Sequence, residues 1–205
     1  MMIIGVIGAG TMGNGIAEVA AQAGRVILVD LDQTRADEGL KAIEKRLNRQ
    51  VEKERIDGAT RDQILGRITP SGELQSLKEA DFVVEAASES LDVKKDIFAS
   101  LGVICSSDCI LATNSSALSI TAIAATVPYP ARVIGVHFFN PATIMKLVEL
   151  VRTPFTSQKC VDESRALVES LGKTAVLVEE SPGFVVNRLL IPMINEAVFL
   201  LAEGV

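Results

Sequence analysis

The sequence predicts an α/β fold, a parallel sheet covered by helices, followed by the first long helix of an all-α C-terminal domain. Short apolar runs alternate with helical patterns along most of the chain, which is typical of a parallel sheet with crossover helices. A glycine-rich segment follows the first apolar run, and the last stretch is almost continuously apolar. These three observations define two parts of unequal size.

The first elements surround the glycine-rich segment. Residues 3–7 form a continuous apolar run, as expected of a central strand covered on both faces. An Ala-rich helix is expected over residues 11–23, ended by Gly24. A second strand over residues 26–29 then ends at Asp30.

A long helix is expected next, at about residues 33–55. Its apolar side chains at Leu40, Ile43, Leu47 and Val51 recur at helical spacing. The other positions are heavily charged, so we expect this helix to project partly into solvent.

The remaining elements continue the alternation up to a Pro-Gly pair. Strands are expected at residues 82–85, 110–113, 133–139, 147–151 and 175–178, and helices at residues 93–101 and 157–171. The Pro-Gly pair at 182–183 separates a domain of residues 1–182 from a second segment of residues 183–205. That segment is expected to be one apolar helix, 184–202, with a kink or a lost hydrogen bond at Pro192. So apolar a helix is expected to begin a helical domain.

Composition excludes several classes of partner. The net charge is −6, and no stretch gathers enough Lys and Arg to coat a phosphate backbone, so we expect no nucleic-acid partner. The apolar N-terminus lacks the basic region of a signal peptide, and no uninterrupted run predicts a membrane span. Three cysteines without a Cys-x-x-Cys pair favour reduced thiols in a cytoplasmic protein over a disulfide or a metal site.

The glycine-rich loop predicts a Rossmann-type dinucleotide-binding domain, because it follows a strand and opens a helix. Its residues are Gly8, Ala9, Gly10, Thr11, Met12 and Gly13. The pyrophosphate is expected on the helix N-terminus, where free N–H groups favour anions. Asp30 is expected to bind the ribose hydroxyls and, with Asp32, to repel a 2′-phosphate, which favours NAD over NADP. FAD, or a glycine-rich turn without a nucleotide, is the alternative.

His137 and Glu149 are the candidate acid–base pair. His137 is the only histidine, and it ends a predicted strand at the edge where such sheets bind ligands. Glu149 interrupts an apolar strand, where a carboxylate is costly unless it is paired. Bonded to one ring nitrogen of His137, it would fix the tautomer and leave the other nitrogen as a base. The alternatives are a structural histidine and an outward-facing edge-strand glutamate.

Six segments resemble one enzyme family in sequence and in order. They are residues 8–13, 84–86, 114–116, 137–141, 145–149 and 181–188. In them the chain resembles the 3-hydroxyacyl-CoA dehydrogenase family, in particular its short-chain bacterial members that act on 3-hydroxybutyryl-CoA. The resemblance implies NAD-dependent oxidation of an L-3-hydroxyacyl-CoA to the 3-ketoacyl-CoA, in fatty acid metabolism such as β-oxidation.

The resemblance also implies roles for single residues. His137 would be the general base and Glu149 its partner, while Ser116 would lie near the reacting hydroxyl and the nicotinamide. Asn187 would hold the substrate carbonyl. Further cofactor contacts would be Glu89, Lys94 and Asn140. One departure is Ala117. The family usually has another hydroxyl residue at this position, directly after the one that aligns with Ser116.

A basic face on the long helix is the candidate site for the CoA phosphates. Arg46, Arg49 and Lys53 fall on one side of that helix, and Lys53 matches the family best. Acidic neighbours leave a solvated charged face as an equal alternative.

Two other functions stay open at this point. The chain could oxidise a hydroxy acid without CoA, such as a sugar acid. It could also be a non-catalytic NAD-binding fragment, because the family's helical domain is larger than residues 183–205. That domain implies a homodimer formed through the helical region.

Overall fold

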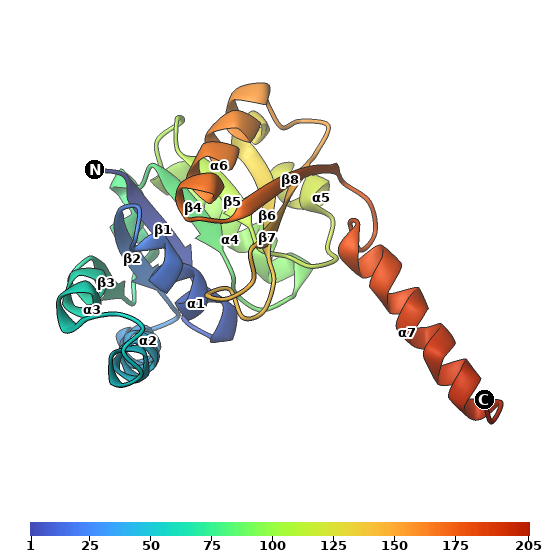
Figure 1. Ribbon diagram of the computed structural model, residues 1–205. Helices are drawn as coiled ribbons and strands as arrows, with labels where there is room; N and C mark the ends of the chain where they lie inside the picture. Colours follow the sequence, from blue (N-terminus) through green and yellow to red (C-terminus); the bar gives the residue numbers. More distant parts are fainter.

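The computed structural model describes all 205 residues and centres on an eight-stranded sheet (Figure 1). The strands are β1 (Ile3–Ile7), β2 (Arg25–Val29), β3 (Ile68–Ser71), β4 (Phe82–Glu85), β5 (Ile110–Thr113), β6 (Val133–Phe138), β7 (Leu147–Arg152) and β8 (Thr174–Glu179). Their order is β3-β2-β1-β4-β5-β6-β7-β8. The first six strands are parallel and have the Rossmann order, which confirms the predicted fold class.

Helices cover both faces of this sheet. They are α1 (Thr11–Ala20), α2 (Gln33–Glu52), α3 (Gly58–Leu65), α4 (Leu91–Ile104), α5 (Ile120–Ala124), α6 (Gln158–Ser170) and α7 (Val186–Ala202), with 3-10 turns η1 (Leu74–Glu79) and η2 (Pro130–Arg132). Buried side chains form one cluster on each face, and along β4 Phe82 and Val84 join one cluster while Val83 joins the other. Burial on both faces explains why the strands are continuous apolar runs.

The sheet is not wholly parallel, which corrects the prediction. β7 pairs antiparallel with β6, and β8 then runs parallel to β7. The connection between β6 and β7 spans only residues 139–146, whereas a parallel crossover needs about a dozen residues or more. A connection this short permits only a hairpin-like return, so β7 runs antiparallel to β6.

Three short elements are absent from the predicted set. β3, α3 and α5 are brief, and their sequences show little periodicity. β3 contains Pro70 and lies at the edge of the sheet, the position where a strand tolerates proline.

The last helix differs from all the others. α7 contains no buried residue, runs continuously through Pro192, and extends away from the sheet (Figure 1). It starts two residues later than predicted, after Phe184, whose φ of 51° belongs to a turn. None of the helices is long and apolar enough to cross a membrane.

Candidate active site

The glycine loop joins β1 to α1 at the carboxyl-terminal edge of the sheet. Gly8 has a φ of +92°, and a Cβ built there would lie 2.6 Å from the Ala86 carbonyl oxygen. A Cβ on Gly13 would lie 1.6 Å from the Gly8 carbonyl oxygen, so both glycines are required by packing. Gly10 is exposed and its Cβ would meet nothing within 4 Å. The space above the N-terminus of α1 is therefore open to a ligand.

Asp30 lies at the end of β2 beside this loop. One carboxylate oxygen accepts a hydrogen bond from Ala9 N at 2.6 Å, and the other accepts one from Leu31 N at 2.7 Å. Asp30 therefore holds the loop in place in addition to any contact with a ribose. A cavity of about 540 Å³ begins here, with Gly8, Gly10, Asp30, Arg35, Ala86 and Ala87 in its walls. Its position and donors fit the adenosine half of a dinucleotide.

A larger cavity, of about 730 Å³, lies at the opposite edge of the sheet, against Met1, Phe82 and Ile110. None of the predicted site residues lines it. We assign the site to the glycine-loop edge, where the chemically distinctive side chains gather.

The structure contains the predicted contact between His137 and Glu149. The two residues are cross-strand neighbours on β6 and β7, and His137 Nδ1 lies 2.8 Å from Glu149 Oε2. Both side chains are buried. The rings of Phe139 and Phe184 pack on the imidazole, with centroids 4.6 and 5.5 Å away. The imidazole Nε2 forms no hydrogen bond within the chain, so it is available to a ligand.

The second oxygen of Glu149 is bonded to the start of α7, a contact that the sequence did not reveal. Glu149 Oε1 accepts hydrogen bonds from Val185 N and Val186 N, each at 3.0 Å. Free N–H groups at a helix N-terminus favour a carboxylate. Glu149 therefore connects the imidazole to the helix that leaves the sheet domain.

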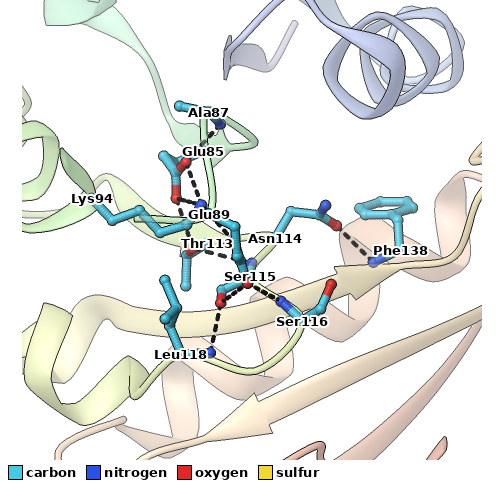
Figure 2. A network of polar contacts seen from close by, with 10 residues as sticks. All are labelled: Glu85, Ala87, Glu89, Lys94, Thr113, Asn114, Ser115, Ser116, Leu118 and Phe138. Carbon is cyan, nitrogen blue, oxygen red and sulfur yellow. Dashed lines mark hydrogen bonds and ion pairs between the residues drawn. The ribbon is translucent and has the colours of Figure 1, made fainter. Parts of the chain in front are cut away.

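Ser116 lies in a loop after β5, where several side chains converge (Figure 2). Glu89 Oε1 accepts hydrogen bonds from Ser116 N at 2.8 Å and from Ser115 Oγ at 2.6 Å. Asn187 Nδ2 lies 3.5 Å from the Ser116 carbonyl oxygen. Asn114 Oδ1 accepts from Phe138 N at 2.8 Å, which ties this loop to the residue after His137. The structure thus brings Ser116, Glu89 and Asn187 together.

Glu89 is kept ionised by its neighbours. Burial alone would raise its pKa, but the hydrogen bonds from Ser115 and Ser116 and the charge of Lys94 outweigh burial and lower the pKa below its ordinary value.

Lys94 is enclosed by protein instead of facing the cavity. Its side chain is 1% exposed, and Nζ lies 2.8 and 2.9 Å from the two oxygens of Glu85 and 3.4 Å from Glu89 Oε2. Glu85 is absent from the predicted site. It carries the signal that marked Glu149, a carboxylate inside an apolar strand.

The remaining predicted residues are exposed or otherwise engaged. Asn140 is exposed and precedes a cis bond to Pro141. Arg46 Nε donates to the buried Glu18 at 2.8 Å, a contact that neither the expected CoA-binding face nor the alternative of a solvated charged face anticipated. Arg49 and Lys53 are exposed and form no ion pair. All three cysteines are buried free thiols, and no cluster of side chains suited to a metal ion is present.

Comparison with known proteins identifies the family. Residues 3–181 match the family described as 3-hydroxyacyl-CoA dehydrogenase, NAD binding domain. The 3-hydroxybutyryl-CoA dehydrogenase of Clostridioides difficile is 45% identical over 205 residues, covering 100% of this chain and 73% of that protein. A probable 3-hydroxybutyryl-CoA dehydrogenase of Bacillus subtilis is 45% identical over 201 residues, covering 98% and 70%.

Solved structures give the same result. The crystal structure of (S)-3-hydroxybutyryl-CoA dehydrogenase from Ralstonia eutropha superposes with a TM-score of 0.96 at 42% identity, covering 100% of this chain and 72% of that one. With the fold, the glycine loop and the sequence matches in agreement, the chain belongs to the 3-hydroxyacyl-CoA dehydrogenase family, and residues 3–181 are its NAD binding domain.

Proposed function

We propose that this protein oxidises the 3-hydroxyl group of an L-3-hydroxyacyl-CoA to a ketone, with 3-hydroxybutyryl-CoA as its short-chain substrate. The observation that carries the proposal is the buried His137–Glu149 pair, which leaves Nε2 of the imidazole without a partner. The names of the relatives supply the substrate class.

The proton of the hydroxyl is taken by His137. With Glu149 ionised, the proton of the neutral imidazole resides on Nδ1, which leaves the lone pair of Nε2 to accept. Bound at the glycine loop, NAD would supply the acceptor for the hydride that leaves C3 of the substrate. As the C–O double bond forms, Nε2 gains the hydroxyl proton and the ring becomes an imidazolium. Glu149 stabilises that cation at 2.8 Å.

Other residues position the reactants. Ser116 would contact the reacting hydroxyl, and Asn187, which is adjacent to it, would hold the substrate carbonyl. The glycine loop, Asp30, Glu89 and Asn140 would hold the cofactor, with Lys94 supporting Glu89. For the CoA phosphates we retain Arg49 and Lys53, which are free of ion pairs, while Arg46 is engaged by Glu18.

Self-association through α7 is part of the proposal. This helix buries none of its residues and exposes Leu189, Ile191 and Met193 at 60% or more. A contiguous apolar surface of this kind favours a partner, and we propose a homodimer. Sedimentation as a monomer at micromolar concentration would contradict it. The buried free thiols favour a cytoplasmic location.

The test is NADH formation by the purified chain, after its intact mass has been verified, on L-3-hydroxybutyryl-CoA. Turnover of the thioester but not of free 3-hydroxybutyrate or a sugar acid supports the proposal. The reverse preference would make the protein a hydroxy-acid dehydrogenase of another kind. NAD binding without turnover would indicate a binding module, and a preference for NADP would contradict the role of Asp30.

A further inference from the structure

Glu85 is a fully buried carboxylate whose oxygens are both engaged (Figure 2). Oε1 accepts from Lys94 Nζ at 2.8 Å and from Ala87 N at 2.7 Å. Oε2 accepts from Lys94 Nζ at 2.9 Å and from Thr113 Oγ1 at 2.7 Å. A carboxylate with four such bonds and no exposed surface has no means of touching a ligand. Its effect must pass through the groups it holds.

The first of these groups is the Thr113 hydroxyl at the end of β5. Because this hydroxyl donates its hydrogen to Glu85, its lone pairs are free to accept from Ser115 N, which lies 3.3 Å away. The carboxylate on β4 thereby orients the acceptor that supports the loop leading to Ser116.

The second group is Lys94, which leads to the same loop by another route. Its ammonium bridges from Glu85 to Glu89 Oε2 at 3.4 Å. Glu89 in turn accepts from Ser115 Oγ and Ser116 N. Without Glu85 the ammonium would keep only Glu89, whose side chain is 45% exposed. Two chains of contacts from one carboxylate therefore meet at residues 115–116.

The third group is the Ala87 N–H, on the cofactor side. Ala86, Ala87 and Ser88 line the 540 Å³ cavity, and the Ala86 carbonyl packs where a Cβ on Gly8 would lie. The same carboxylate that supports the Ser116 loop therefore also holds a wall of the dinucleotide cavity.

We infer that Glu85 is a positioning residue: it holds the loop of Ser116 and the cavity wall at residues 86–88 in one fixed relation while touching neither substrate nor cofactor. The importance of Ser116 for hydride transfer rests on the proposed function. The ordering of the Ser116 loop by Glu85 is independent of that function.

The test compares the variants Glu85→Gln, Thr113→Val and Thr113→Ser of the 205-residue chain with the unmodified chain. Hydrogen–deuterium exchange of peptides covering residues 114–118 reports the order of the loop without requiring turnover. We expect exchange to be about two- to tenfold faster in Glu85→Gln and Thr113→Val, because each substitution removes roughly one hydrogen bond that supports the loop. Thr113→Ser keeps the hydroxyl and should retain slow exchange. Glu18→Gln removes a different, partly buried ion pair, the one with Arg46, and should leave exchange at 114–118 unchanged.

Hydride transfer is followed with substrate deuterated at C3. The isotope effect on kcat is a ratio, so it does not depend on the fraction of folded enzyme. It should rise in Glu85→Gln and Thr113→Val, because a displaced loop makes hydride transfer more rate-limiting, and stay unchanged in Thr113→Ser.

Each outcome decides the inference. Unchanged exchange at 114–118 in Thr113→Val and in folded Glu85→Gln would overturn it, and if Glu85→Gln does not fold, Thr113→Val decides. Faster exchange with an unchanged isotope effect would overturn its link to the reaction. An unmodified chain that does not turn over the thioester would refute the proposed function, while the exchange result would still decide whether Glu85 orders the loop.

Discussion

Two buried pairs of carboxylate and base lie at the same edge of the sheet and differ in what they leave free. In the Glu85–Lys94 pair the ammonium faces two carboxylates, and both oxygens of Glu85 are bonded. In the His137–Glu149 pair both carboxylate oxygens are also bonded, but one ring nitrogen has no partner. A buried pair that is fully satisfied can support its neighbours, whereas proton transfer requires an atom left open.

The largest effect is expected where that open atom is removed. His137→Gln eliminates the proton acceptor, so kcat should fall by about 10²- to 10⁴-fold. The dissociation constant for NADH, measured by fluorescence titration, should change little, because no residue of the glycine loop is altered. A variant with unimpaired turnover would remove His137 from the mechanism and with it the contrast between the pairs.

Glu149→Gln tests whether the partner acts through its charge. The amide oxygen can still accept from Val185 N and Val186 N, which directs the amide NH₂ toward Nδ1. Nδ1 then becomes an acceptor, the ring proton moves to Nε2, and the base is lost. We expect kcat to fall nearly as far as in His137→Gln, with helix content retained by circular dichroism. Activity within a few fold of the unmodified chain would show that the tautomer is set by another group.

For the Glu85–Lys94 pair the main effect is expected on the free energy of unfolding. Lys94→Met leaves the Glu85 carboxylate buried without its cation, which costs about 3–5 kcal/mol of the free energy of unfolding. Urea denaturation should show this loss, and the double variant Glu85→Gln/Lys94→Met should recover part of it. A single variant as stable as the unmodified chain would mean that Glu85 needs no counter-charge.

The smallest effect is expected on how the free energy of unfolding depends on pH under acidic conditions. The pKa of Glu89 is lower in the folded chain than its ordinary value of 4.5. Its ionised form therefore stabilises the fold above pH 4.5, and this contribution is lost as the pH falls below that value. Unfolding followed between pH 6 and pH 3 should show the difference between the unmodified chain and Glu89→Gln shrinking with acidification. A constant difference would exclude the charge of Glu89 as its cause.

Local pattern was sufficient for much of the fold and for part of the site. The glycine loop, Asp30 and seven of the eight strands follow from residue types within a few positions of one another. The partnership of His137 and Glu149 also follows, because a carboxylate in an apolar strand requires a nearby partner. The same reasoning applied to Glu85 would have indicated the second pair.

Contacts between distant segments could not be predicted in this way. The antiparallel direction of β7 was not predicted, although the pairing of Glu149 with His137 was. The start of α7 supplies Glu149 with N–H donors 36 and 37 residues away. Arg46, expected on a CoA-binding face, is instead bonded to Glu18 on α1.

The sequence by itself determined the sheet with its covering helices, the dinucleotide loop and the contact between His137 and Glu149. Apolar periodicity, glycine requirements and a carboxylate inside an apolar strand are local properties of a chain. Only the tertiary structure decided which polar atoms are satisfied and which stay open. That outcome depends on strand register and on the approach of side chains far apart in sequence, which local periodicity does not encode. In this protein the tertiary structure encloses Lys94 between two carboxylates and leaves Nε2 of His137 available.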